Sequence, residues 1–482
     1  METRAIYRRL AQHYREAIEA GSLAQGDRFP SVRSLMSRHE VSMSTALQVC
    51  RQLESDGWLE ARPRSGNFVC QPRRPTRSAL TEPLPGLLPD PAQYVGIHAR
   101  VSEFIALCRH TPTKVNFSRA RCAPQLYPGE ALKIAATRVL RHQPELLVRG
   151  GPHNGNVVFR GVLANRAMAS GMVLAPDEII VTHGCIEALN LALRAVTQAG
   201  DIVAVESPTF YGLLQILESL GLRALEIPTS PQTGISIEAL ELAIQSGEAI
   251  RALVVVPHLQ NPLGSCMPDA HKIRLVDLCA QNDIPLIEDD TYAALFDGNS
   301  PQRAIKSWDS TGNVMHCASL HKILAPGMRL GWITGGRWQA RVEMFKHAQT
   351  HYNEELTQLT AADFMNSSAY DRHLRRLRTT LRDQRQRMTD AITRYFPEGT
   401  RLNDPPGGLS LWVELPRRLS SRKLFDSALS EGILVAPGLM FSNSNRYEQF
   451  IRINCGLPYS PEVAHALLRL GQLCEQLIEE GT

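Results

Sequence analysis

Apolar side chains recur every three or four positions in three stretches near the start of the chain, which is the spacing of amphipathic helices. The first stripe consists of Ile6, Leu10, Tyr14, Ala17 and Ile18. Gly21 follows this stripe, and glycine is a common residue at a helix end. We therefore expect a first helix that ends near residue 21.

Two shorter helical patterns follow, separated by a few residues. We expect Ser31 to cap the first, and the second to run from Ser42 to just before Gly57. The side chains expected in their core are Val32, Leu35, Met36, Ala46, Val49, Cys50 and Leu53. On the second of these helices Ser44, Gln48 and Arg51 face outward, and Met43, Thr45 and Leu47 lie near its start. Two helices joined by a tight turn predict a helix-turn-helix, whose second helix enters the major groove of DNA.

The segment 58–70 alternates in the manner of two strands around a turn at residues 63–66. Such a hairpin would place Arg62 and Arg64 on a wing beside the helices. A small helical domain whose arginines are only solvated fits the same spacing, so the pattern alone does not decide between the two.

From about residue 114 onward, short β-branched runs alternate with helical stretches. The expected strands are 178–181, 202–205, 253–256, 286–287 and 314–318. Short apolar strands between amphipathic helices predict an α/β domain with a mostly parallel, doubly wound sheet. Ligands of such sheets bind at the carboxyl ends of the strands.

A proline-rich segment between residues 71 and 91 separates the two patterns, because proline disfavours helix interiors and stiffens an extended linker. Apolar residues between 101 and 108 have helical spacing, and this short helix either begins the second domain or belongs to the linker. We expect a DNA-reading domain at 1–71, a linker at 72–112 and a second domain at 113–482.

The composition is that of a globular protein in a reduced compartment. Hydrophobic residues make up 43% and charged residues 21% of 482 residues, and no apolar run approaches the roughly 20 residues that a bilayer requires. The ten cysteines contain no CxxC pair, so neither a disulfide framework nor a metal site is expected. We expect a cytoplasmic protein without a membrane partner.

The positive charge is concentrated at the start of the chain. Residues 1–78 contain 13 arginines, no lysine and eight acidic residues, whereas the rest of the chain carries a small negative excess. This asymmetry is typical of a phosphate-binding module attached to an enzyme-like body, although a solvated surface can also produce it.

The run GSLAQGDRFPSVRSLMSRHEVSMSTALQVCRQLESDGWLEARPRSGNFV resembles the GntR-type winged helix-turn-helix along its whole length. The resemblance covers the PSVR entry, the VSMST start of the recognition helix and the RSGNFV wing. It implies contacts with phosphates or base edges of double-stranded DNA by Ser31, Arg33, Ser42, Ser44, Thr45, Arg62 and Gly66. The chain departs from the family at Met43, where an arginine is common.

In the second domain, four polar residues follow expected strands and match what pyridoxal phosphate (PLP) requires. This aldehyde needs an amine for a Schiff base, an acid beside its pyridine nitrogen and donors to its phenolate oxygen. Lys322 supplies the amine, Asp289 the acid, and Asn261 and Tyr292 the donors. Taken singly, each has a plainer interpretation, such as a turn former, a surface acid or metal ligand, or a solvated lysine.

The PLP phosphate needs hydroxyl, guanidinium and backbone N–H groups at a helix N-terminus. The residues that meet this need are Gly184, Cys185, Ile186, Ser319 and Arg329.

The segments ESPTFYG, NPLG, EDDTY and SLHKILAPGMRLGW resemble fold-type I aminotransferases in order and spacing, over about 116–474. The resemblance implies a main α/β domain with a small α/β domain, and Lys322 as the Schiff-base residue. It also implies that Phe210 stacks on the pyridine ring, with Tyr211 as a competitor, and that Arg452 binds the carboxylate of an effector. The chain departs at Gly150, where the family has a tyrosine that reaches the phosphate across the dimer; Arg149 is a possible substitute.

A GntR-type winged helix joined by a proline-rich linker to an aminotransferase-like body resembles the MocR subfamily of transcription regulators. This resemblance implies a homodimer, head-to-tail, and regulation by PLP or by a small amino-compound effector. The rival functions are a working aminotransferase with an accessory DNA module, and a DNA-binding protein whose large domain is only a dimerisation scaffold without cofactor.

Overall fold

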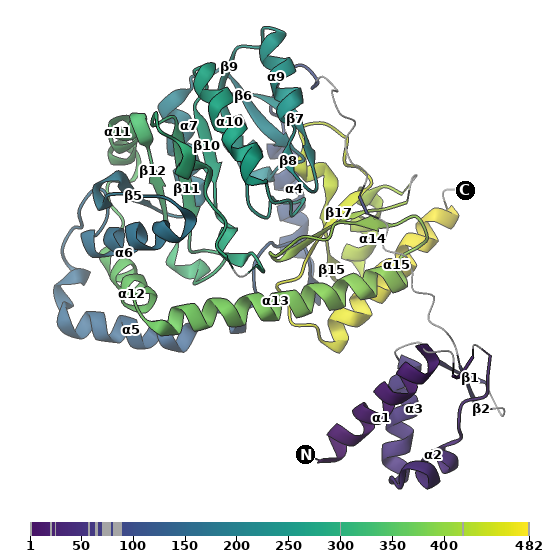
Figure 1. The fold of residues 1–482 in the computed structure, drawn as a ribbon. Helices are drawn as coiled ribbons and strands as arrows, with labels where there is room; N and C mark the ends of the chain where they lie inside the picture. The colour runs from purple at the N-terminus through teal and green to yellow at the C-terminus, as the bar shows by residue number, and fades with distance from the viewer. Residues whose placement is uncertain are drawn as a thin grey trace. The chain divides into compact units, whose positions relative to one another are not determined.

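The computed structural model describes residues 2–19, 22–24, 26–55, 58–62, 66–69, 79–80, 89–298, 300–416 and 419–480. Gly21, Gly57, the turn at 63–65 with Arg64, and most of the proline-rich segment lie outside the described residues. The chain divides into a smaller unit, Met1–Thr76, and a larger unit, Arg77–Thr482. Each unit is described by itself (Figure 1).

The smaller unit contains three helices and a hairpin. The elements are α1 (Glu2–Glu19), α2 (Val32–His39), α3 (Met43–Ser55), β1 (Leu59–Arg62) and β2 (Gly66–Val69). The two strands pair antiparallel from Leu59↔Val69 to Arg62↔Gly66. Its core includes Ile18, Leu35, Ala46, Val49, Cys50 and Leu53, so the helical stripes in the sequence face inward.

Local hydrogen bonds explain where α2 and α3 begin. The Ser31 hydroxyl accepts a bond from the backbone N–H of Ser34 at 3.2 Å, as expected of a cap. The Ser42 hydroxyl accepts from the N–H of Thr45 at 3.3 Å. Each serine hydroxyl thereby pairs with one of the N–H groups that have no partner within the first turn of a helix.

A nine-stranded sheet forms the centre of the larger unit. Its order is β3 (Gln93–Tyr94), β7 (Arg223–Ser230), β6 (Ile202–Ser207), β9 (Ile250–Val255), β10 (Leu286–Asp289), β11 (Val314–Ser319), β12 (Gly331–Thr334) and β5 (Ile179–Thr182), with β8 (Gly234–Ile235) paired to β7. The strands from β7 to β11 are parallel, whereas β12 is antiparallel to both neighbours. This mixed sheet places the ends of β6, β9, β10 and β11 on one edge.

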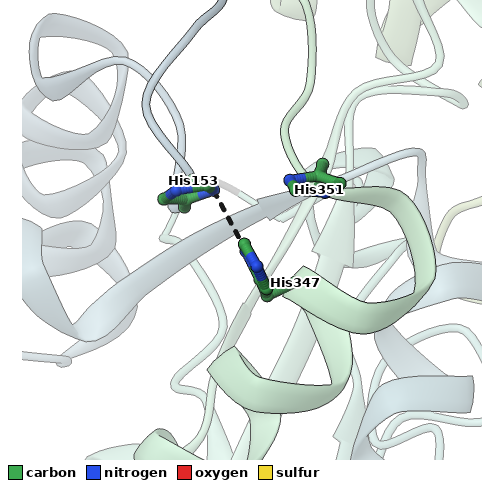
Figure 2. A group of neighbouring side chains, drawn as sticks. All are labelled: His153, His347 and His351. Atoms are coloured by element: carbon green, nitrogen blue, oxygen red, sulfur yellow. Dashed lines mark hydrogen bonds between the residues drawn. The ribbon is translucent and has the colours of Figure 1, made fainter.

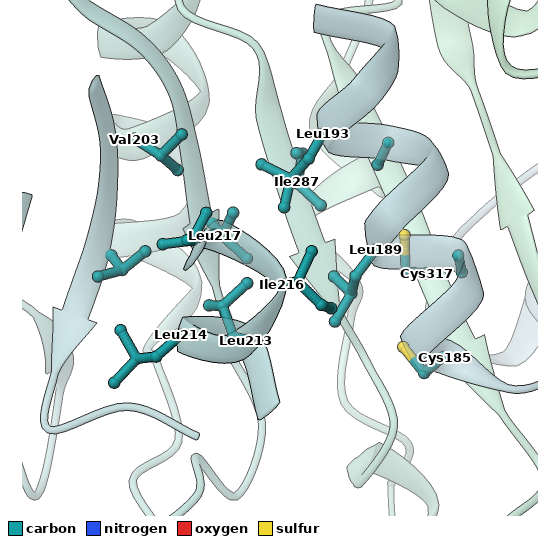
Figure 3. Packing of buried hydrophobic residues seen from close by; sticks show 14 of the residues in the cluster. Cys185, Leu189, Leu193, Val203, Leu213, Leu214, Ile216, Leu217, Ile287 and Cys317 are labelled. Atoms are coloured by element: carbon teal, nitrogen blue, oxygen red, sulfur yellow. The ribbon is translucent and has the colours of Figure 1, made fainter. Parts of the chain in front are cut away.

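Helices cover both faces of this sheet because alternate strand side chains point to opposite sides. Strand residues such as Val203, Ile287 and Cys317 pack against α7 (Cys185–Val196) and α8 (Tyr211–Ser219) (Figure 3). Ala204, Leu253 and Leu286 face the other side with α9 (Ile237–Gln245) and α10 (Asp269–Gln281).

A second, smaller sheet lies in the C-terminal part. Strands β13 (Arg401–Leu402), β14 (Ser410–Glu414), β17 (Phe450–Asn454) and β16 (Ala436–Pro437) form it, and β15 (Ile433–Leu434) pairs separately with β4 (Val115–Asn116). Apart from α4, which is described below, the remaining α-helices are α5 (Gly129–His142), α6 (Val157–Ala167), α11 (Gln339–Thr350), α12 (Glu355–Met365), α13 (Ser368–Tyr395), α14 (Ser421–Ser430) and α15 (Pro461–Glu480). The long α13 runs from α12 to α15 and so joins the two sheets (Figure 1).

The helix expected near residues 101–108 belongs to the larger unit. It is α4 (His98–His110), and Val95, Ile97 and Val101 are buried in the core that contains α7 and α8. The Glu218 carboxylate accepts from the N–H groups of Ile97 and His98 at 2.6 and 2.7 Å. Residues 89–112, the later part of the expected linker at 72–112, therefore contribute to the folded body, and of the two assignments left open for this helix the structure supports the second domain.

None of the helices in the described ranges combines the length and apolarity needed to cross a membrane.

Candidate functional site

The carboxyl ends of the parallel strands bring most of the predicted site residues together. Asp289 ends β10, Ser319 ends β11 and Lys322 lies three residues further on. Asn261 follows β9 after a short loop. The arrangement matches the rule that open α/β sheets bind ligands at this edge.

Lys322 lies against the aromatic ring of Tyr292, with its Nζ 5.5 Å from the ring centre. The amine also donates to the carbonyl of Ala120. Burial and, to a smaller extent, the nearby cation of Arg452 lower the pKa of Lys322 from 10.5 to about 8. A lysine in this environment has a much larger neutral, nucleophilic fraction than a surface lysine.

Asp289 is buried and is held by three donors. Its Oδ1 accepts from the Thr291 hydroxyl at 2.6 Å, the Thr291 N–H at 3.2 Å and the Cys185 thiol at 3.3 Å. Burial raises the pKa of this carboxyl, and the Thr291 bonds partly offset the rise. A cationic ring nitrogen beside Asp289 would favour its ionised form.

Arg452, on β17 of the smaller sheet, is 1% exposed. It donates through Nη1 to the Asn261 side-chain oxygen at 2.8 Å and through Nη2 to the Ser118 carbonyl at 2.6 Å. Burial lowers the pKa of this guanidinium, and Tyr211 and Tyr292 oppose that effect. Among the residues that the structure describes, no carboxylate pairs with it, and its Nε has no hydrogen-bond partner.

Gly184 and Arg329 form one side of a candidate phosphate cradle. Gly184 precedes α7 with φ 83°, a conformation that favours glycine, and a Cβ added to it would lie 3.4 Å from Arg329 Nη2. Arg329 donates to the carbonyl of His183 at 2.9 Å. The first N–H groups of α7, at Cys185 and Ile186, therefore begin beside a guanidinium, as anion binding requires.

The aromatic pair at the start of α8 remains compatible with either stacking assignment. Phe210 precedes the helix, and its ring centre lies 5.0 Å from that of Tyr211. Apart from the larger effect of burial, the Tyr211 phenol also raises the pKa of both Arg452 and Tyr292, so it lies near these two side chains.

The segment around Gly150 has partners of its own. A Cβ added to Gly150 would lie 3.2 Å from the Tyr352 hydroxyl, so a tyrosine from the segment between α11 and α12 borders this position. Arg149 is engaged by Glu355 at 3.0 Å and by Glu145 at 3.8 Å. It would have to leave these carboxylates to reach a phosphate.

Several contacts at this edge were not predicted. Thr291 is the chief holder of Asp289, and the carbonyls of Ser118 and Ala120 accept from Arg452 and Lys322. The sequence offers a signal only for Thr291, because an aspartate side chain often accepts from the backbone N–H two residues further on.

In the smaller unit, most of the predicted DNA-contacting side chains lie on the surface. Ser31, Arg33, Ser42 and Ser44 are exposed, and Met43 is 60% exposed.

The other predicted DNA-contacting positions are Thr45, which is buried, and Arg62 and Gly66 on the hairpin. Thr45 is only 3% exposed, and its hydroxyl shares a hydrogen bond with the Ser42 hydroxyl at 2.9 Å. It does not present its hydroxyl to solvent. Gly66 has φ 97° and pairs with Arg62, whose side chain lies outside the described atoms.

The residues present fit pyridoxal phosphate. The buried Arg452 has an unpartnered Nε and no acidic partner among the described residues. A bound anion would supply the counter-charge and the hydrogen-bond acceptor that this guanidinium lacks. An amine with a lowered pKa, a buried carboxylate and a cationic cradle at a helix start complete the donor set.

Two families match the chain. Residues 128–470 match the family of class I and II aminotransferases, and residues 6–69 match the gntR family of bacterial regulatory proteins. The first match spans more than half of the chain.

Two transcription regulators match this chain over nearly its whole length, and a transaminase matches about three quarters of it. The HTH-type transcriptional regulators YjiR and YdcR of Escherichia coli are 37% and 35% identical, and each match covers 98% of this chain and 99% of the relative. The 2-aminoadipate transaminase of Thermus thermophilus is 28% identical over 76% of this chain and 91% of its own length.

Solved aminotransferases share the fold of the larger unit. The α-aminoadipate aminotransferase LysN of Thermus thermophilus, complexed with N-(5'-phosphopyridoxyl)-L-leucine, has a TM-score of 0.73 at 26% identity and covers 80% of this chain and 96% of its own. The Pyrococcus horikoshii kynurenine aminotransferase, in complex with PMP, has a TM-score of 0.72 at 26% identity, covering 78% and 94%. This fold implies pyridoxal phosphate as the cofactor. The chain belongs to the class I and II aminotransferase family and, with its gntR-family N-terminal domain, to the HTH-type transcriptional regulators of the MocR type.

Proposed function

We propose that this protein is a DNA-binding transcription regulator whose larger unit binds PLP at Lys322 and senses a small amino compound that carries a carboxylate. The observation that supports this most is the buried Arg452. Its Nε has no hydrogen-bond partner, and no acidic side chain pairs with it among the described residues. A planar carboxylate accepts two parallel bonds from a guanidinium and neutralises its charge.

The proposed roles follow from the geometry of each group. When bound, PLP supplies an aldehyde that reacts with amines and a ring that withdraws electrons. Lys322 provides the amine, and Asp289 holds a proton at the ring nitrogen. Asn261 and Tyr292 donate to the ring oxygen, and one of the aromatic residues Phe210 and Tyr211 covers the ring.

The phosphate would be held at the start of α7. We assign this role to Gly184, Cys185 and Ile186 through their backbone N–H groups, and to the side chains of Ser319 and Arg329.

Arg452 provides a route from effector binding to a change of shape. It belongs to the smaller sheet, whereas its partner Asn261 follows a strand of the larger one. An effector carboxylate that takes over the Asn261 bond would change how the two sheets are held together. Such an effector alters DNA binding only if it binds one arrangement of the protein more tightly than another. In the simplest case these are two arrangements of a head-to-tail homodimer.

In the smaller unit, the exposed Ser31, Arg33, Ser42 and Ser44 are proposed to contact operator DNA, with Arg62 and Gly66 on the wing. Because Thr45 is buried, we propose that it orients Ser42 through their shared bond.

Two variants of the full chain test the proposal. Lys322→Ala should lose the visible absorbance band that PLP gives with a lysine, and borohydride treatment followed by peptide mapping should find no pyridoxyl group in it. Lys322→Ala should retain basal DNA binding. Lys133→Ala, which removes a lysine that is 72% exposed, is the matched control and should keep the band.

Arg33→Ala should weaken DNA binding and leave the PLP band unchanged, because its side chain lies on the surface of the other unit. A pyridoxyl group mapped elsewhere than Lys322 in the unaltered protein would contradict the cofactor assignment. Equal loss of both properties in either variant would contradict the separation of the two functions.

A working aminotransferase is the second candidate, because the site keeps a lysine, an acid and a carboxylate-binding arginine together. Steady turnover of an amino acid with a keto acid would favour it. A change in DNA affinity on addition of an amino acid, without such turnover, would favour the regulator.

A further inference from the structure

Three histidines from two distant parts of the sequence meet on the surface of the larger unit (Figure 2). His347 lies in the last turn of α11, His351 directly follows that helix, and His153 comes from the loop before α6. All three are exposed, and one ligand nitrogen from each lies within 4.8 Å of the others. The cluster plays no part in the proposed cofactor or DNA sites.

The spacing of the rings suits a transition-metal ion. The Nδ1 atoms of His153 and His347 lie 3.4 Å apart. Two nitrogens that each lie about 2.0–2.1 Å from a tetrahedral Zn²⁺ ion are about 3.3–3.4 Å apart. The ring centres of His347 and His351 are 4.4 Å apart, so the third imidazole can turn towards the same point.

The surroundings of the three imidazoles favour metal binding over an ion-paired cluster of histidines and carboxylates. No carboxylate joins the three imidazoles among the described residues, so no ion pair explains why they gather. His351 has φ 57° and ψ −97°, which lies outside the usual left-handed region, and its ring lies beside that of His347 (Figure 2).

The two segments are also held together before any metal binds. The side-chain amide of Asn154 donates to Glu343 on α11 at 2.9 Å. The neighbouring Asn156 donates to Glu355 at the start of α12 at 2.6 Å. A metal site built on fixed segments loses little conformational freedom on binding.

We propose that His153, His347 and His351 form an open binding site for one divalent late transition-metal ion such as Zn²⁺. Three neutral imidazoles leave a fourth position to water, as in open zinc sites. Imidazole ligands suit zinc, copper and nickel, whereas Mg²⁺ and Ca²⁺ prefer oxygen ligands. The bound ion links the loop before α6 to the end of α11.

A second cluster, formed by His258, Glu288 and Asp290, is unsuited to a metal. The Lys272 amine lies 3.0 Å from Nε2 of His258, and Nδ1 of the same ring contacts Asp290 at 2.5 Å. Both nitrogens of His258 are therefore engaged, and an ammonium stands where a cation would have to enter.

The test uses the full-length, chelator-treated protein titrated with Zn²⁺ in competition with a chromophoric chelator. We expect one equivalent to bind, and Co²⁺ in its place to give the visible absorbance of a four-coordinate ion. His153→Asn, His347→Asn and His351→Asn should each weaken Zn²⁺ binding at least about tenfold. His142→Asn, which removes another exposed histidine, should bind as the unaltered protein does.

Thermal unfolding provides a second readout. Zn²⁺ should raise the unfolding midpoint of the unaltered protein and of His142→Asn but not of the three cluster variants, and Mg²⁺ should have no effect. Because the three rings are exposed, the variants should melt like the unaltered protein without metal. Zn²⁺ affinity in the unaltered protein no tighter than in the three cluster variants would overturn the proposal.

Discussion

Replacing Lys322 with methionine should stabilise the cofactor-free protein at neutral pH. The amine has a pKa of about 8 in the folded chain against an ordinary 10.5, so burial disfavours its charged form. That difference corresponds to roughly 3 kcal/mol of destabilisation while the amine is protonated in both states. Methionine removes the charge at similar volume, and it also loses the bond to the Ala120 carbonyl, worth about 1 kcal/mol. We expect a net gain of roughly 2 kcal/mol at pH 7.

The pH dependence fixes the cause of this gain. Between pH 8 and pH 10.5 the unfolded chain binds more protons at Lys322 than the folded chain, so the stability of the unaltered protein rises with pH. The advantage of Lys322→Met should therefore shrink by roughly 2 kcal/mol between pH 7 and pH 9.5.

Urea unfolding of both proteins at a series of pH values, followed by far-UV circular dichroism, measures the difference. The transition of the smaller unit is an internal control, since Lys322 lies in the other unit. A variant that is less stable at pH 7, by an amount that does not change with pH, would refute the burial argument.

Three further substitutions test other parts of the structure. Ser31→Ala removes the hydroxyl that caps α2 and should lower the stability of the smaller unit by about 1 kcal/mol in thermal unfolding. Asp289→Asn should weaken PLP binding at least about tenfold in an absorbance titration, because a charge-assisted bond is lost; unchanged affinity would remove Asp289 from the site. Gly155→Ala should cost roughly 2–4 kcal/mol, since φ is 96° and the added Cβ would lie 2.3 Å from Val181. Its control, Gly129→Ala, meets no atom within 4 Å and should leave the unfolding midpoint unchanged or slightly raised.

The sequence predicted the elements of this protein better than their arrangement. The runs at 202–205, 286–287 and 314–318 became β6, β10 and β11, because short β-branched segments between helices have few alternatives. The antiparallel β12 between β11 and β5 was not foreseen. Its position depends on pairing with strands that local periodicity does not identify.

In the candidate site, too, the sequence predicted individual residues but not the contacts between distant parts of the chain. Strand-end positions and residue chemistry were enough to select Lys322 and Asp289. The carbonyl of Ala120 lies 202 positions from Lys322, and no spacing rule joins the two. Thr45 lies in the first turn of α3, where a shift of one residue around the helix separates a buried side chain from an exposed one. His347 and His351 have the four-residue spacing of helical metal ligands, but the distant His153 gave no signal.

Met43, which opens α3 and is 60% exposed, has a consequence for the choice of operator. A thioether cannot donate to the O6 and N7 acceptors of guanine as an arginine does. It can only make van der Waals contact, and the C5-methyl group of thymine is the apolar feature that the major groove offers. If α3 enters the groove as proposed, the base pair opposite Met43 should be read by its methyl group, and exchanging thymine for uracil there should weaken binding.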